Sequence, residues 1–438
     1  MKIKQYKRVI NSGIRWLSDV PVHWQLGKVK NMASLTPRKP RLSTLGDKKC
    51  SFLPMEKLKL GVIKLDEERP ISEVYDGYTY FTNGDVLIAK VTPCFENKNM
   101  ALAQGLTNGI GFGSSEIYVL RPKSSSTGRY LLYRLQEDEF MRIATSEMTG
   151  AGGLKRVPSD FLLNFKVAIP PIQEQQKIAQ FLDYETAKID ALIEEQKWLI
   201  ELLKEKRQAV ISHAVTKGLN PDAPMKDSGV EWLGQVPDHW KVGRLKNHLR
   251  LKNGQDYKTV ETESADGFPV IGSGGQFTKA TKFLHNGESV LLGRKGTIDK
   301  PLYINGKFWT VDTMFYSEVF KSSSAKYVYY LAMTVPFSLY STNTALPSMS
   351  QSDLHNHITV IPPLVEQSEI ANYIDEQLEK LDRLSDRLLT NSKLLQERRS
   401  ALISAAVTGK IDVRDWQQPE DAGSIDSNAA VQTERQDG

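Results

Sequence analysis

Two long stretches of the chain carry apolar residues at steps of three, four or seven. They begin with IPPIQEQQKIAQFLD at Ile169 and IPPLVEQSEIANYID at Ile361, and after these starts no Pro or Gly occurs before Gly218 and Gly409. A Pro pair favours an extended start, and the residues that follow favour a helix. The apolar steps are typical of a coiled-coil seam. The predicted seam residues are Ile178, Leu182, Ile189, Leu192, Leu203 and Val210 in the first helix, and Ile370, Ile374, Leu381, Leu384, Leu395 and Leu402 in the second.

The two helices are expected to pack on each other. Each would be about 60 Å long at roughly 1.5 Å per residue, and an apolar stripe of that length needs an apolar partner. Because the chain must return through the intervening residues before the second helix begins, we predict an antiparallel coiled coil. Separate packing of each helix on its own domain is the alternative.

The helical stretches belong to a longer internal repeat. Residues 169–216 and 361–408 align without a gap and share 21 of 48 residues. GIRWLSDVPVHW at 13–24 and GVEWLGQVPDHW at 229–240 share seven of twelve, and KSSSTGRYLLYRL weakly matches KSSSAKYVYYLAM. The stretches between these segments differ. We therefore expect one architecture used twice, with divergent interiors.

The interiors alternate between short strand-like runs, Gly-rich turns and single helices, which predicts an α+β fold. Strands are predicted at 84–91, 115–122, 164–170, 288–296 and 358–362, and helices at 130–147 and 327–339. The fold class is thus two pseudo-repeated mixed α/β domains joined by two long helices that form the antiparallel coiled coil. The predicted boundaries are 1–170 and 220–361 for the mixed domains, 171–219 and 362–416 for the helical spacers, and 417–438 for a disordered acidic tail.

Charge is unevenly distributed along the chain. The net charge is +5, but residues 1–170 contain 26 Lys and Arg against 16 Asp and Glu. A polyanion would favour this block. Only Cys50 and Cys94 are present, no apolar run approaches the roughly 20 residues of a membrane helix, and no secretion signal is recognisable. We therefore expect a reduced cytoplasmic protein that makes no membrane contact.

The motifs of covalent chemistry are not recognisable. There is no phosphate-binding loop, and DLHNHI at 353–358 resembles a metal-nuclease motif only superficially, because further ligands do not follow it. His23 and His239, each followed by a Trp, favour a capped turn over catalysis. We therefore expect no catalytic residue, no metal site and no cofactor in this chain.

Polar residues in turns after strands are candidates for nucleic-acid contact. Arg and Lys pair with guanine edges or phosphates, Asn pairs with adenine, and backbone amides of Gly-rich loops bind phosphates. Solvated basic loops are the alternative at every position. The candidates are Lys90, Thr92, Asn97 and Lys98 in one turn, Lys155 and Arg156 on a Gly-rich loop, and Ser273, Arg294, Lys295 and Thr297 in the second block.

The paired WL-x-x-VP-x-HW segments, the paired IPP-x-x-EQ helix starts and the junction TKGLNPDAPMKDSGVEWLG at 216–234 form a specific set. Together they resemble the DNA-specificity subunits of type I restriction–modification systems, over residues 9–416. LLGRKGTIDKPLY at 291–303 resembles stretches of the target recognition domains in that family. The first block lacks the Gly-Arg-Lys-Gly turn, so its contact residues are less well defined.

The resemblance implies that each mixed domain reads one half of a bipartite double-stranded DNA target, and that the coiled coil sets the spacing of the halves. It implies two methyltransferase subunits, which carry S-adenosylmethionine and methylate adenine. It also implies two restriction/translocase subunits, which use ATP and magnesium to cleave DNA. A self-contained methyltransferase or nuclease, and a DNA-binding regulator without enzyme partners, are the alternatives.

Overall fold

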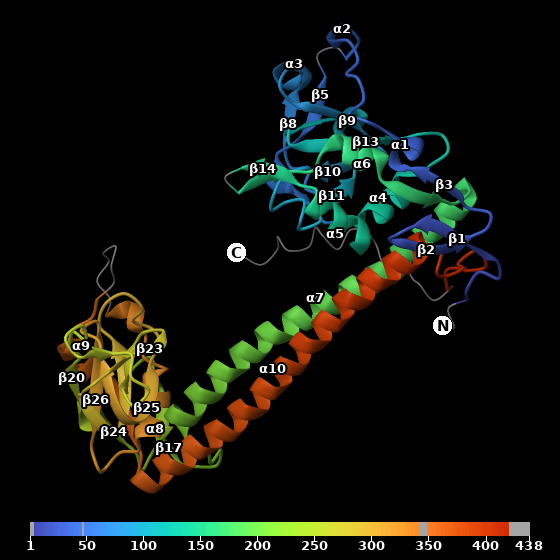
Figure 1. Cartoon of the computed structure of the whole chain (residues 1–438). Coiled ribbons are helices and arrows are strands. Elements are labelled where there is room, and N and C mark those ends of the chain that lie inside the picture. Colours follow the sequence, from blue (N-terminus) through green and yellow to red (C-terminus); the bar gives the residue numbers. More distant parts are fainter. Residues whose placement is uncertain (1–3, 46–47, 152, 341–347, 420–438) are drawn as a thin grey trace. The chain divides into compact units, whose positions relative to one another are not determined.

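The chain is described by a computed structural model that covers residues 4–45, 48–151, 153–340 and 348–419. It divides into two compact units, which are Met1–Glu195 with Asn391–Gly438, and Gln196–Thr390. Each unit holds a mixed α/β region and a part of each of two long helices (Figure 1). The predicted disordered tail, 417–438, lies outside the described residues from 420 onward.

The long helices α7 (Ile172–Lys217) and α10 (Leu364–Val407) both begin after a Pro pair and end close to a glycine. Gly218 follows α7 directly and Gly409 lies just beyond α10, with φ angles of 80° and 77°. Because this left-handed conformation suits a residue without a Cβ atom, the two glycines stop the helices.

The helices pack antiparallel within each unit. In the first unit, Arg399 Nε of α10 donates to Asp190 Oδ1 of α7 at 2.8 Å. In the second unit, Arg207 of α7 pairs with Asp382 of α10. Residue numbers therefore rise along one helix as they fall along the other, as the sequence predicts.

The seam of the coiled coil differs from the prediction at two positions. Leu192 and Leu384 are each 47% exposed, whereas the other ten predicted seam residues are buried or half-buried. The seam continues from Ile189 through the buried Ile193. Steps of three and four alternate along a coiled-coil seam. At 3.6 residues per turn, the step of three from Ile189 to Leu192 turns the side chain about 60° away from Ile189, whereas the step of four to Ile193 stays closer to the seam. The same shift applies at Leu384.

The mixed region of the first unit contains two four-stranded sheets, with strand orders β11-β10-β13-β4 and β8-β5-β12-β9. The central strand β10 reads VLIA and is fully buried, as expected for a continuous apolar run. The sheet strands are β4 (Ala33–Leu35), β5 (Lys49–Leu53), β8 (Glu68–Pro70), β9 (Thr79–Thr82), β10 (Val86–Ala89), β11 (Met100–Leu102), β12 (Ile110–Gly113) and β13 (Ile117–Pro122). Paired outside them are β1 (Val9–Ile14) with β2 (Leu17–Pro21), β3 (Gln25–Lys28) with β16 (Lys166–Ile169), β6 (Leu58–Lys59) with β7 (Val62–Ile63), and β14 (Thr149–Ala151) with β15 (Leu154–Arg156). The short helices are α1 (Val29–Met32), α2 (Leu42–Leu45), α3 (Ile71–Val74) and α6 (Ser159–Asn164).

The single helix predicted over 130–147 is wrong, because two helices occupy this stretch. They are α4 (Gly128–Gln136) and α5 (Asp138–Ser146), separated at Glu137. Glu137 has an extended backbone, and its carboxylate accepts hydrogen bonds from the amides of Glu139 and Phe140. It caps α5 and so starts a new helix instead of continuing α4.

The mixed region of the second unit is built on one seven-stranded sheet of order β20-β26-β24-β25-β22-β23-β21. All its pairings are antiparallel except β22 with β25. Its strands are β20 (Leu249–Asn253), β21 (Glu261–Thr262), β22 (Phe268–Gly272), β23 (Gly275–Ala280), β24 (His285–Gly293), β25 (Leu302–Thr310) and β26 (Met314–Val319). Two further pairs are β17 (Met225–Asp227) with β18 (Gln235–Pro237), and β19 (Lys241–Arg244) with β27 (Ile358–Ile361).

The helix predicted over 327–339 is too long. Helix α8 (Ala325–Ala332) ends before Pro336, and only a short 3-10 turn at Phe337–Leu339 follows. Pro lacks an amide hydrogen and disfavours helical backbone in the residue before it. The other helix of this region is the short α9 (Gln351–Asn356).

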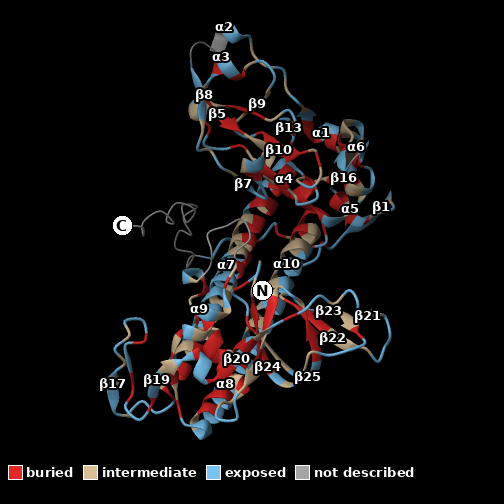
Figure 2. Cartoon of the chain, turned by 90° about the vertical axis from the view of Figure 1, so that its left-hand side faces the viewer, coloured by how far each residue is buried: buried red, intermediate tan, exposed pale blue. Residues whose placement is uncertain are grey.

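One hydrophobic core in each unit joins the mixed region to the long helices. In the first unit this core includes β10 and α4 together with the start of α7 and the end of α10. In the second unit it includes β20, β24 and α8 together with the end of α7 and the start of α10. Figure 2 shows buried residues along β10, β13 and α4. Over the described residues, no helix is both long enough and apolar enough to cross a membrane.

Candidate nucleic-acid interface

A glutamate at the start of each long helix holds the Trp motif of the same unit. Glu174 of α7 is buried and accepts hydrogen bonds from the Tyr6 hydroxyl and from Trp24 Nε1 at 3.1 Å. His23 Nε2 lies 2.7 Å from the other oxygen of Glu174. These contacts explain the repeated spacing of His and Trp after Pro as a structural anchor, as the capped-turn interpretation expects.

The second unit has the same contacts at the start of α10. Glu366 accepts a hydrogen bond from Trp240 Nε1 at 2.9 Å, and His239 Nε2 lies 2.9 Å from the same carboxylate. Trp240 is fully buried, whereas Trp232 of this motif is half-exposed and stacks on His357.

The glutamine after each of these glutamates holds the KSSS segment. Gln175 Oε1 accepts from Ser126 Oγ and from the Thr127 amide, both at 3.1 Å, and its Nε2 donates to two backbone carbonyls. In the second unit Gln367 Oε1 accepts from the Ser324 amide at 2.9 Å. The three pairs of repeated segments therefore meet at one junction in each unit.

Tyrosines complete both junctions at the helix ends. The Tyr130 hydroxyl donates to the Val407 carbonyl of α10 at 3.4 Å, and the Tyr327 hydroxyl donates to the Val215 carbonyl of α7 at 3.1 Å. Carbonyls in the last turn of a helix have no partner within the helix, so these hydroxyls satisfy them. Each mixed region is thus fixed to both long helices of its unit.

Two of the predicted contact segments of the first unit lie side by side. The Thr92 amide donates to the Lys155 carbonyl at 3.0 Å, and the Lys155 amide donates to Thr92 Oγ1 at 3.0 Å. The Thr92 hydroxyl donates to the Gly153 carbonyl at 2.7 Å. Lys155 and Arg156 lie on strand β15 of a hairpin and not on a loop, which corrects the prediction. Of the glycines of TGAGG, Gly150 lies on the partner strand β14, where it pairs with Lys155, and Gly153 lies in the turn of this hairpin.

Most cations of this surface are paired with carboxylates. Arg156 binds Glu116 through two nitrogens, at 2.6 and 3.1 Å, and Lys90 Nζ lies 3.7 Å from Glu116. The hydrogen bonds from Arg156 hold the pKa of Glu116 below its ordinary value. Lys98 Nζ donates to Asp138 of α5 at 2.7 Å and to the Gln136 carbonyl at 3.0 Å, so it points toward the junction of α4 and α5. Lys155 and Asn97 are exposed.

The basic turn of the second unit, Arg294 to Thr297, follows strand β24. A Cβ atom at Gly293 would lie 2.2 Å from the Thr297 carbonyl oxygen, so only glycine allows the turn to fold back on the strand. The Arg294 guanidinium donates to the Asp312 carbonyl at 3.3 Å. Neither Arg294 nor Lys295 makes an ion pair with any residue that the structure describes. Ser273 lies in a separate turn, between β22 and β23.

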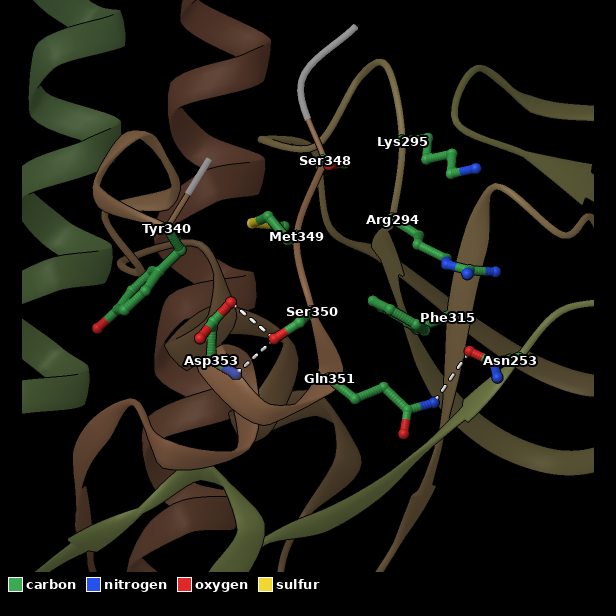
Figure 3. Close-up of a pocket in the computed structure, with 10 residues that line it drawn as sticks. All are labelled: Asn253, Arg294, Lys295, Phe315, Tyr340, Ser348, Met349, Ser350, Gln351 and Asp353. Atoms are coloured by element: carbon green, nitrogen blue, oxygen red, sulfur yellow. Dashed lines mark hydrogen bonds between the residues drawn. The ribbon is translucent and has the colours of Figure 1, made fainter. Parts of the chain in front are cut away.

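A cavity of about 400 Å³ opens beside this turn (Figure 3). Arg294 and Lys295 line it together with the buried Phe315 and Met349 and with two amides, Asn253 and Gln351, that the sequence analysis missed. Gln351 Nε2 donates to Asn253 Oδ1 at 3.0 Å. These amides are 98 residues apart, and neither lies in a recognisable motif, so no local signal indicates them.

The histidines of DLHNHI have structural partners. His355 Nε2 accepts from the Leu251 amide at 3.0 Å, and the Tyr340 hydroxyl lies 2.8 Å from His357 Nδ1. Burial lowers the pKa of His357 to about 4, so this imidazole is neutral at pH 7. In the parts of the chain with described placement, no three His, Cys, Asp or Glu side chains form a group that could hold a metal ion.

A matched groove lies along the helices in each unit. In the first unit Phe181 of α7 faces Arg398, Ala401 and Leu402 of α10. In the second unit the groove is lined by the residues at the corresponding positions of the internal repeat. These are Tyr373 of α10 and Lys206, Ala209 and Val210 of α7.

By sequence the chain is similar to one group of known proteins. A family model described as the type I restriction modification DNA specificity domain matches residues 72–202 and 237–391. The specificity subunit of the Escherichia coli type I restriction enzyme EcoAI is 38% identical over 167 residues, which cover 36% of this chain and 27% of that protein. The chain likewise spans 27% of the EcoEI specificity subunit, at 34% identity. The MjaVIII specificity subunit of Methanocaldococcus jannaschii is 25% identical over 316 residues, which cover 65% of this chain and 70% of that protein.

Two solved structures share the fold. One is a chain of the structure described as the basis of complex assembly and conformational transition of the type I R-M system, with a TM-score of 0.73 and 15% identity. It covers 90% of this chain and 99% of its own. The other is the HsdS subunit of Thermoanaerobacter tengcongensis, with a TM-score of 0.58 and 16% identity, covering 92% of this chain and all of its own.

Proposed function

This chain belongs to the type I restriction modification DNA specificity family, and from that membership we propose that it is the non-catalytic recognition subunit of a type I restriction–modification complex. Each mixed region reads one half of a bipartite double-stranded DNA target. Two methyltransferase subunits carry S-adenosylmethionine and methylate adenine in this target. Two restriction/translocase subunits use ATP and magnesium for cleavage. The proposed location is the cytoplasm.

The observation that carries this proposal is the repetition of one anchored junction with different regions attached to it. Glu174 and Glu366, with their Trp partners, hold the two junctions in the same way. The region attached to the first has two four-stranded sheets, and the region attached to the second has one seven-stranded sheet. A protein that recognises two unlike half-sites from equivalent positions needs a constant junction to the long helices and a variable DNA-binding region.

The reading surfaces we propose are the hairpin of the first unit and the basic turn of the second. The first combines Lys90, Thr92, Asn97, Lys98, Lys155 and Arg156, and the second combines Ser273, Arg294, Lys295 and Thr297. Phosphate oxygens can replace Glu116 as the partner of Arg156, because both are anionic acceptors with similar geometry. Arg294 is half-buried and fixed by the Asp312 carbonyl, which favours base reading, whereas the exposed Lys295 favours phosphate contact.

Arg294→Ala is expected to weaken target binding by about 1–3 kcal/mol and to relax the recognised sequence at one position. Lys295→Ala should instead lower the slope of log affinity against log salt concentration by about 1, with the same sequence recognised. Anisotropy titrations of the full chain with its methyltransferase subunits at several salt concentrations, together with methylome sequencing, measure both effects. Lys380→Ala on α10 is the matched control. Unchanged target sequence and affinity in both variants would remove these residues from the interface.

The two matched grooves support the docking of two copies of one partner. Each offers an aromatic ring, a cation and small apolar side chains, and the two sets correspond through the internal repeat. A single helix of a methyltransferase subunit fits such a groove through apolar side chains that are three and four residues apart. Because the grooves correspond, two identical subunits bind in the same way.

Ala401→Glu and Ala209→Glu should each remove one methyltransferase subunit, and the double variant should remove both. The added carboxylate occupies the groove and must lose its water when a helix docks. Mass photometry of complexes purified through the specificity chain counts the bound subunits. Ala191→Glu, at an exposed position of α7 outside the grooves, is the control and should keep two. A partner count that stays at two in the double variant contradicts the docking proposal, and an unmodified chain that captures no methyltransferase supports the regulator alternative.

A further inference from the structure

Two amide side chains form an exposed pair at the rim of the cavity beside Arg294. Gln351 Nε2 donates to Asn253 Oδ1 at 3.0 Å (Figure 3). Among the residues that the structure describes, neither amide makes another hydrogen bond. The pair therefore has hydrogen-bonding groups free for a ligand.

The hydrogen-bonding groups that this pair leaves free are the same in number and type in either orientation of the bond. Each amide has one carbonyl oxygen and one NH2 group, and the bond between them uses the carbonyl of one and one hydrogen of the other. The pair then retains one unused carbonyl, one unused NH2 group and the second hydrogen of the donating amide. This result is the same whichever of the two amides is the donor.

An acceptor and a donor side by side match one base in the major groove. Adenine presents the N7 acceptor and the N6 amino donor on its major-groove edge. Guanine presents two acceptors there, cytosine a donor and thymine an acceptor with a methyl group. We infer that the Asn253–Gln351 pair is a specificity-determining contact that reads an adenine in the half-site of the second unit.

The backbone around the pair holds it in place. Asn253 ends strand β20, where it pairs with the buried Phe315 of β26. Gln351 begins α9, and Ser350 before it accepts a hydrogen bond from the Asp353 amide at 3.1 Å. Both amides thus project from structured elements, and the bond between them limits their rotation. This restriction lowers the entropy lost on binding.

The charges around the pair favour a nucleic acid. Arg294 and Lys295 line the same cavity and make no ion pair within the described residues, whereas the carboxylate of Asp353, which also lines it, accepts a hydrogen bond from Ser350 Oγ at 2.7 Å. Two such cations attract the phosphates that flank a base, which fixes the register of the DNA on the amide pair. The inference rests on the proposed function and extends it by naming a base and the residues that read it.

The test uses the full chain in complex with its methyltransferase subunits. Methylome sequencing first gives the two half-sites. Duplexes are then made with 7-deazaadenine, which lacks the N7 acceptor, at each adenine other than the methylated ones. The complex should bind one such duplex about 5- to 100-fold more weakly than the natural target. Asn253→Ala and Gln351→Ala should bind the natural target more weakly by a similar factor and lose most of their sensitivity to this substitution.

Several outcomes would overturn the inference and leave the proposed function intact. These are a half-site for the second unit without a further adenine, a complex that tolerates every 7-deazaadenine, and variants that remain as sensitive as the unmodified chain. The duplex series on the unmodified chain does not depend on the folding of any variant. Asn356→Ala is the matched control, because this exposed amide of the same helix binds Arg244 and the Ser352 carbonyl instead. A chain that recognises no DNA sequence with its methyltransferase would contradict the proposed function itself.

Discussion

Glu174→Ala is expected to lower the free energy of unfolding of the first unit by about 3–5 kcal/mol, the largest effect on stability that we foresee for a single substitution. Glu174 is only 6% exposed, and it accepts hydrogen bonds from the Tyr6 hydroxyl and from Trp24 Nε1. Without it, these donors are buried without a partner. An unpaired buried donor loses its hydrogen bonds to water and gains nothing in return.

The second junction supplies the matched comparison. Glu366 has a side chain that is 24% exposed, and among the described side chains it binds His239 and Trp240 alone. In Glu366→Ala only one buried donor, Trp240 Nε1, loses its partner, and the exposed His239 can bind water instead, so we expect a smaller loss of about 1 kcal/mol. Chemical denaturation of the full chain, followed by hydrogen exchange to assign each transition to a unit, measures both changes. Equal losses in the two variants would contradict the difference in burial.

Removal of one heptad from both long helices is expected to change the recognised sequence by shortening its gap. The ion pairs Asp190–Arg399 and Arg207–Asp382 share one register, since each pair of residue numbers has the same sum, and in this register the segments to delete are 193–199 of α7 and 390–396 of α10. Deletion of both segments keeps the phase of the seam and shortens each helix by about 10 Å. At about 3.4 Å per base pair, the gap should shrink by at most about three base pairs, with both half-sites unchanged.

Methylome sequencing of cells that carry the double deletion gives the new gap directly. Deletion of 193–199 alone is the control. This deletion shortens α7 but not α10, so the ion pairs Asp190–Arg399 and Arg207–Asp382 can no longer form in one register. It should therefore lower the melting temperature without giving a defined shorter gap. An active double-deletion complex with the original gap would show that the helices do not set the spacing.

Regular patterns in the sequence predict the long helices and their antiparallel packing, because a seam is a local and repeated feature. This prediction is less exact where neighbouring residues favour different local structures. At 192 and 193 two apolar residues are adjacent, and only the phase of the whole seam selects Ile193 over Leu192. At Glu137 a capping carboxylate divides a continuous helical pattern in two.

Contacts between distant residues account for the remaining differences. The Asn253–Gln351 bond joins β20 to α9 across 98 residues, and the bonds between Thr92 and Lys155 join a turn to a hairpin across 63. Neither pair has a local signature, because tertiary structure alone brings the partners together. The candidate Arg294 is predictable for the opposite reason, since the Gly-Arg-Lys-Gly turn is a local motif.

The ion pairs of the long helices also decide which way the helices can associate. Asp190 corresponds to Asp382 in the internal repeat, and Arg207 corresponds to Arg399. Each helix therefore carries an acid nearer its beginning and a base nearer its end. A parallel, in-register pair would bring Asp against Asp and Arg against Arg, and like charges in close contact are unfavourable. One acidic and one basic residue in each helix thus favour the antiparallel direction. In register, the duplicated segment has charges that complement those of its own copy when the copy runs in the opposite direction.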